Sequence, residues 1–244
     1  MFPLQDTIPS RRIPFMNISI IILNTLVFLY ELKLSPYEIE LFFRVFGLVP
    51  EKFTYYKDLL SWGDYYPFLT NMFLHGGWAH FIGNMWTLWI FGDNVEDRMG
   101  HGRYLLFYVL CGVAASYTHY LVNMYSPVPA LGASGAISGV MGAYMFLFPH
   151  SRIVFLVPLF FIPYFFEIPA FVYLLFWFLG QLASGTLSIF ADSMGGGIAF
   201  WAHIGGFVAG VALYRLFVNS RFHRYCRECD DSPEAYYYRY RNYY

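Results

Sequence analysis

The stretch ALGASGAISGVMG, residues 130–142, places Ser134 between glycines at the start of an apolar segment. Gly132 and Gly135 permit a tight turn and the close approach of another segment. Gly135 and Gly139 are about one helical turn apart, which predicts a face almost bare of side chains against which a second helix packs closely. Ser134 therefore has two interpretations: a hydroxyl that packs or hydrogen-bonds in a small-residue helix interface, or a nucleophile at the mouth of a helix.

A second stretch, WAHIGGFVAG at residues 201–210, places His203 at the start of another apolar segment. Gly206 and Gly210 repeat the small-residue spacing, so the two segments are expected to pack with their backbones close together. Ser134 and His203 would then lie at corresponding depths near the ends of their helices. Because a base within hydrogen-bond reach activates a hydroxyl, this pair favours the nucleophile interpretation.

The composition of the 244 residues is typical of a membrane protein. Hydrophobic residues make up 58% of the chain and charged residues only 13%, and the mean hydropathy is +0.45. A soluble domain carries about 25% charged residues. The formal net charge is −1, and no basic patch is large enough to indicate nucleic-acid binding. Three cysteines are too few for a disulfide framework, and we expect no cleavable signal peptide at the start of the chain.

The long apolar segments predict an all-α membrane protein with six membrane-spanning helices in one integral membrane domain. The domain comprises residues 15–219, between a polar leader at residues 1–14 and a Tyr- and Arg-rich tail at residues 220–244. The predicted spans are residues 15–34, 73–95, 104–123, 134–149, 171–190 and 200–219.

The segments between the predicted spans also have sequence patterns that predict their structure. Residues 35–72 alternate charged with aromatic residues, which predicts amphipathic segments lying at the membrane interface. Three prolines in residues 150–170 exclude a continuous helix and indicate a short extended or re-entrant connection. Glu96 and Arg98 follow the second span and are expected to form a structural lock. Residues 191–199 are rich in glycine and lie where a lid would be.

The distribution of basic residues predicts the orientation in the membrane. With six spans, both termini lie on one side, together with all but four of the fifteen Lys and Arg residues. The positive-inside rule therefore places both termini in the cytoplasm, and Ser134 and His203 near the outer ends of their spans. The four basic residues on the other side are Lys33, Arg44, Lys52 and Lys57. A prokaryotic plasma membrane is expected, because no targeting extension is recognised.

Polar residues of the second span belong to the same end of the bundle. His80 and Asn84 are four residues apart and share a helix face, which could direct two hydrogen-bond donors at one oxyanion. The alternative is an interhelical hydrogen bond that stabilises the bundle. His75 likewise has two interpretations, a role in the site or a position in the interfacial loop.

Together these motifs resemble those of the rhomboid family of intramembrane serine proteases. The residues that match are the family's GxSG at residues 132–135, AHxxGxxxG at residues 202–210 and HxxxxHxxxN at residues 75–84. The resemblance covers residues 10–219 and extends to a six-span core with a long first loop.

The resemblance implies an activity and roles for single residues. Ser134 would be the nucleophile and His203 the general base of a dyad without an acidic third member. His80, Asn84 and the backbone N–H of Ser134 would bind the oxyanion, and His75 would help line the route of water. The implied partners are the lipid bilayer and other membrane proteins, cut near the ends of their transmembrane helices. No cofactor is expected, and the oligomeric state is left open.

Two positions depart from the family pattern. Some members carry an aromatic residue four positions after the nucleophile, stacked on the catalytic histidine, whereas this chain has Ser138. The ring of His203 is then expected to be oriented by other means, such as Ser138 or a water molecule. Some members also carry a Trp-Arg pair before the second span; here Tyr65-Tyr66-Pro67 takes its place, which leaves the packing of the first loop open.

The cysteines in the tail could form a reduced thiol pair or part of a zinc site. Cys226 and Cys229 form a CxxC motif in the tail, with His223 nearby. A reduced thiol pair in a flexible tail is the default interpretation, and zinc binding is the weaker one because a fourth ligand is not evident. Cys111, within the third span, is predicted to lie in the core.

Two other functions compete with a protease. A catalytically inactive relative would bind and retain membrane proteins, but it would have no need to keep both Ser134 and His203 together with His80 and Asn84. A small transporter would have charged residues at mid-membrane and an internal repeat. In this chain the charges cluster at the ends of the spans and no clear repeat is found.

Overall fold

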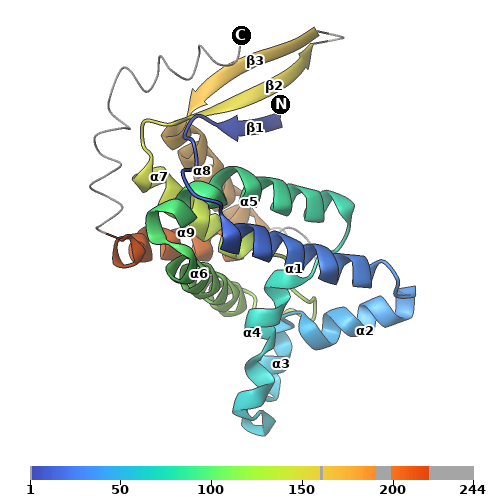
Figure 1. Cartoon of the computed structure of the whole chain (residues 1–244). Coiled ribbons are helices and arrows are strands. Elements are labelled where there is room, and N and C mark those ends of the chain that lie inside the picture. The colour runs from blue at the N-terminus through green and yellow to red at the C-terminus, as the bar shows by residue number, and fades with distance from the viewer. Residues whose placement is uncertain (1, 160–161, 191–198, 220–244) are drawn as a thin grey trace.

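A bundle of six long helices forms the body of the protein (Figure 1). The computed structural model describes residues 2–159, 162–190 and 199–219. The thiol pair predicted in the tail and nearly all of the predicted lid lie outside these residues. The six helices are α1 (Phe15–Glu31), α5 (Trp78–Met99), α6 (His101–Val122), α7 (Ser134–Leu147), α8 (Ala170–Phe190) and α9 (Phe200–Phe217).

Each long helix overlaps one predicted span, but the helices differ in whether their length and apolar composition are sufficient to cross a membrane. By length and composition, α6, α8 and α9 are long and apolar enough to cross one. The apolar helices α1 and α7 are shorter, with 17 and 14 residues. Helix α5 begins five residues later than predicted, because Gly76 and Gly77 interrupt the chain and Gly77 has a φ of 155°. The count of six spans stays a prediction.

Helices α7 and α9 pack with their backbones in contact. A Cβ added to Gly206 would collide with the carbonyl group of Gly135, and one added to Gly210 would collide with the backbone of Gly139. Such close approach is possible only where both helices lack side chains on the facing surface. Cys111 of α6 lies beside Gly139 and is fully buried in the core.

A three-stranded antiparallel sheet covers one side of the bundle (Figure 1). Its strands are β1 (Phe2–Asp6), β2 (Arg152–Leu159) and β3 (Ile162–Pro169), in the order β1-β2-β3. The all-α prediction omitted this sheet, and the leader and the 150–170 connection were not expected to pair. Prolines exclude a helix from the connection, and its β-branched and aromatic residues favour strands. Pro158 and Pro163 lie opposite each other near the turn of the hairpin.

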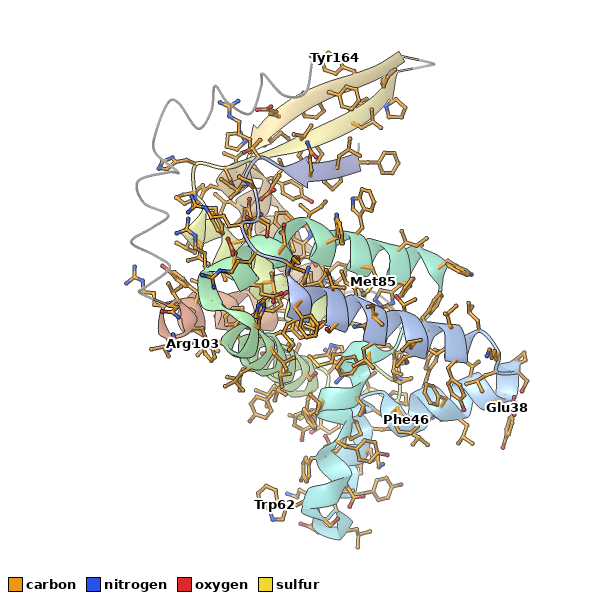
Figure 2. The ribbon with its side chains drawn as sticks, in the orientation of Figure 1. Glu38, Phe46, Trp62, Met85, Arg103 and Tyr164 are labelled. Atoms are coloured by element: carbon orange, nitrogen blue, oxygen red, sulfur yellow. The ribbon has the colours of Figure 1, made fainter. Side chains whose placement is uncertain are left out.

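The first loop contains short helices that project from the bundle (Figure 1). They are α2 (Pro36–Phe46), α3 (Pro50–Tyr55), η1 (Lys57–Leu59), η2 (Trp62–Tyr65), α4 (Pro67–Thr70) and η3 (Asn71–Phe73). Figure 2 shows Trp62 at the far end of this projection, where its side chain is almost fully exposed. At its base the loop is attached by mutual backbone hydrogen bonds between Leu48 and Ala130, which hold the segment that leads into α7.

Glu96 and Arg98 stabilise the opposite end of the bundle. The Glu96 carboxylate accepts hydrogen bonds from the backbone N–H groups of Met16 at 2.9 Å and Asn17 at 2.7 Å. A negative charge at these N–H groups satisfies the first turn of α1 and complements its dipole. The guanidinium of Arg98 lies 4.6 Å from the centre of the Phe148 ring. Both residues therefore have the structural role expected of them, but they lie in the last turn of α5 rather than in a turn after the second span.

Candidate active site

Ser134 is placed by a glycine turn at the first residue of α7. Gly132 has a φ of 120°, a conformation that residues with a Cβ rarely adopt, and its N–H donates to the carbonyl of Asn71 at 2.9 Å. This turn directs the chain into the helix immediately before Ser134. The backbone N–H of Ser134 therefore belongs to the first turn of α7, whose N–H groups have no acceptor within the helix.

His203 of α9 meets the hydroxyl of Ser134. Its Nε2 lies 2.8 Å from Ser134 Oγ, within hydrogen-bond distance. The two residues are 69 positions apart in the sequence, and the close packing of α7 on α9 brings them together. The arrangement has the form of a nucleophile with an adjacent base.

The other side of the His203 ring is held by α8 rather than by Ser138. Nδ1 of His203 lies 2.7 Å from Oε1 of Gln181, and the ring of Trp177 lies 5.9 Å from the imidazole, tilted by 36°. The hydroxyl of Ser138 instead donates to the carbonyl of Ser134 at 2.6 Å, within its own helix. Of the two alternatives expected, Ser138 or a water molecule, Ser138 does not contact the ring; Gln181 and Trp177 of α8 do.

His80 and Asn84 approach the Gly132 turn from α5. A Cβ at Gly132 would collide with the imidazole of His80 and lie 3.6 Å from Nδ2 of Asn84. The side chain of Asn84 is buried, and its Nδ2 has no hydrogen-bond partner among the described residues. A buried amide donor without an acceptor costs free energy of folding. We therefore expect Asn84 to donate to an acceptor on a bound molecule.

His75 lies behind this group rather than beside the serine. Its ring packs edge-on against His80, with the ring centres 5.2 Å apart, and against Phe28 of α1. Its backbone N–H donates to the carboxylate of Glu31 at 3.2 Å, and its side chain is buried. His75 is therefore linked through His80 to the Gly132 turn that precedes Ser134.

A small cavity adjoins Ser134. Its volume is about 20 Å³, and its walls include Ser134, Gly132, Ser116, His119 and Asn71. A space of this size holds roughly one water molecule, provided that polar groups line it. The hydroxyl of Ser116 and the side chain of Asn71 meet these requirements, and they are 2.9 Å apart.

Several of these residues were not predicted from the sequence. Gln181 is the only amide or charged residue in α8, and a single amide in such an apolar helix is a signal of function. Trp177 lies one turn earlier on the same face. Ser116 and His119 are likewise polar residues inside an apolar helix, and their spacing of three residues puts them on one face, which is the signal that could have identified them.

Comparisons with known proteins point to one family. The family model of the Rhomboid domain matches residues 62–220. Rhomboid protease GluP of Bacillus subtilis is 39% identical over 100 residues, which are 41% of this chain and 19% of that relative. Rhomboid-like protein 11, chloroplastic, of Arabidopsis thaliana is 32% identical over 117 residues, and Rhomboid protein 1, mitochondrial, of Saccharomyces cerevisiae 29% over 158. The match spans 40% of each of the latter two relatives and 48% and 61% of this chain.

Proposed function

The chain belongs to the rhomboid family, and on that basis we propose that it is an intramembrane serine endopeptidase. It would hydrolyse peptide bonds in or next to transmembrane segments of other membrane proteins. The observation that carries the proposal is the 2.8 Å contact between Ser134 Oγ and His203 Nε2 at the end of two closely packed helices. The matched segments are at most about two fifths of the first three relatives' own lengths, so substrates and partners are also part of the proposal.

The proposed first step acylates the serine. His203 Nε2 takes the Ser134 hydroxyl proton as Oγ attacks the carbonyl carbon of the substrate, and the carbonyl oxygen becomes an oxyanion. The tetrahedral intermediate then collapses and breaks the C–N bond, and the proton on His203 passes to the leaving amine. The product is an ester between Ser134 and the new carboxyl end of the substrate.

The second step would hydrolyse this ester with one water molecule. The cavity of about 20 Å³ beside Ser134 offers a place for that water, next to the hydroxyl of Ser116. His203 would take a proton from the water as the oxygen attacks the ester, and would return the proton to Ser134 Oγ. The reaction thereby restores both side chains and releases a carboxylic acid.

Asn84 is proposed to bind the oxyanion, together with His80 and the backbone N–H of Ser134. Its unpartnered Nδ2 points to the region next to the Gly132 turn, where the substrate carbonyl would lie. We expect Asn84→Ala to lower kcat by about 10²–10³ with little change in KM, because the donor acts chiefly on charge that develops in the transition state. The measurement is steady-state cleavage kinetics. A change in KM alone would contradict the assignment.

The chain is a multi-pass membrane protein, and its setting beyond that is proposed. Both termini would face the cytoplasm, with Ser134 near the outer surface. The three relatives include bacterial, chloroplast and mitochondrial proteins, so a prokaryotic plasma membrane stays a prediction.

The proposal is tested by cleavage and by covalent labelling. Purified protein in detergent is incubated with tagged single-span substrates whose helices contain small, helix-breaking residues, and the fragments are identified by mass spectrometry. A fluorophosphonate that modifies nucleophilic serines is expected to label Ser134 and to leave Ser138, one turn further along α7, unlabelled. Failure to cleave any substrate, together with absence of label, would overturn the proposal in favour of a protein that only binds membrane clients.

A further inference from the structure

Gln181 occupies the place that a triad's third residue takes in soluble serine and cysteine proteases. Its Oε1 lies 2.7 Å from Nδ1 of His203, while Nε2 of the same ring faces Ser134 Oγ at 2.8 Å. The three side chains therefore form a continuous chain from α8 through α9 to α7. An amide in this position has a physical precedent in the Cys-His-Asn arrangement of papain-like proteases.

The amide oxygen selects one form of the imidazole. A neutral histidine carries its proton on either Nδ1 or Nε2, and a carbonyl oxygen can only accept a hydrogen bond. Contact with Oε1 therefore stabilises the tautomer with the proton on Nδ1. In that tautomer the lone pair of Nε2 faces the Ser134 hydroxyl and can accept its proton.

Trp177 limits the rotation of the His203 ring. Trp177 and Gln181 are four residues apart on α8 and share the face directed at His203. The indole, tilted by 36° to the imidazole at 5.9 Å, restricts rotation of the ring, while the amide bond fixes its tautomer. The neighbouring apolar residues of α8 offer the ring no hydrogen-bond acceptor of this kind.

We propose that Gln181 is a positioning residue that holds His203 in the tautomer competent to act as base toward Ser134. This inference rests on the proposed protease function. The competing view is that the bond merely joins α8 to α9, as polar side chains often do between membrane helices.

The test combines kinetics with direct observation of the tautomer. Gln181→Leu removes the acceptor, and we expect kcat to fall by about 10–100-fold with KM nearly unchanged, by analogy with metal-bound histidines that lose the partner orienting their ring. Gln181→Glu restores an acceptor at the same reach. It is expected to recover most of kcat and to move the acid limb of the pH profile to higher pH, because a carboxylate stabilises the protonated imidazole.

Thr186→Val is the matched control on the same helix. The Thr186 hydroxyl is exposed and donates at 2.8 Å to the carbonyl of Leu182, one turn earlier in α8. Its loss leaves the His203 contact intact, so kcat and the pH profile are expected to match those of the wild type. Thermal unfolding of all the variants shows whether a loss of activity reflects a loss of folded protein.

Nitrogen-15 NMR of histidine-labelled protein in detergent separates this inference from the proposed function. The His203 signals, identified by their absence in His203→Ala, are expected to show a protonated Nδ1 in the wild type and a mixture of tautomers in Gln181→Leu. A wild-type protein that neither cleaves substrate nor takes the label at Ser134 would refute the protease function, but its spectrum would still decide the tautomer. Protonated Nε2 in the wild type, or a Gln181→Leu variant with unchanged kcat and spectrum, would overturn the inference.

Discussion

Alanine at Ser134, alanine at His203 and both changes together are each expected to lower the cleavage rate by a similar factor, on the order of 10⁴–10⁶. The hydroxyl is a poor nucleophile unless Nε2 of His203 takes its proton, and the imidazole has nothing to activate once the hydroxyl is gone. Removing either residue therefore removes the function of both. Single-turnover cleavage with excess protein measures the residual rates.

The matched control for this series is Ser138→Ala. Ser138 is a buried serine one turn along α7, and its hydroxyl is satisfied by the Ser134 carbonyl at 2.6 Å. Loss of that bond leaves the Ser134–His203 contact in place, so cleavage is expected near the wild-type rate. If the rate of the double variant fell by the product of the fold reductions seen in the two single variants, Ser134 and His203 would act independently. That result would contradict the dyad.

The proximity of Ser134 and His203 could be predicted because glycine spacing carries information about helix packing. Gly135 and Gly139 face Gly206 and Gly210, and this spacing fixes both the closeness of the helices and their relative depth. Ser134 lies directly before Gly135, and His203 lies less than one helical turn before Gly206, so both residues fall near the same end of the packed pair. The repeated glycines therefore made the proximity of Ser134 and His203 easier to predict than a contact that depends on one residue.

The sheet and the Gln181 contact could not be predicted for different reasons. Strand β1 pairs Phe2 with Leu156, and nothing local in the polar leader indicates a partner about 150 residues away. Ser184 and Ser188 share a helical spacing with Gln181, but serines are common in membrane helices and do not mark that face as functional. The role of Gln181 depends on the distance between α8 and α9, which only the folded structure provides.

Gly206→Ala is expected to damage both stability and activity. The added Cβ would meet the Gly135 carbonyl, so α9 must move away from α7 or distort. Overpacking of this kind costs about 1–3 kcal/mol, and a displacement of about 1 Å at a reacting pair can lower a rate by about 10²-fold. Thermal unfolding and cleavage kinetics measure the two effects separately.

Gly180→Ala is the control for Gly206→Ala, because it makes the same change at a helix position without a close neighbour. A Cβ at Gly180 of α8 meets nothing within 4 Å, so alanine adds no clash there. Alanine is favoured over glycine inside a helix by about 1 kcal/mol, and the unfolding temperature is expected to rise or stay unchanged. The contrast isolates close packing from helix propensity, because both variants make the same chemical change. If Gly206→Ala unfolded and cleaved like Gly180→Ala, the contact between α7 and α9 could not be what holds His203 against Ser134.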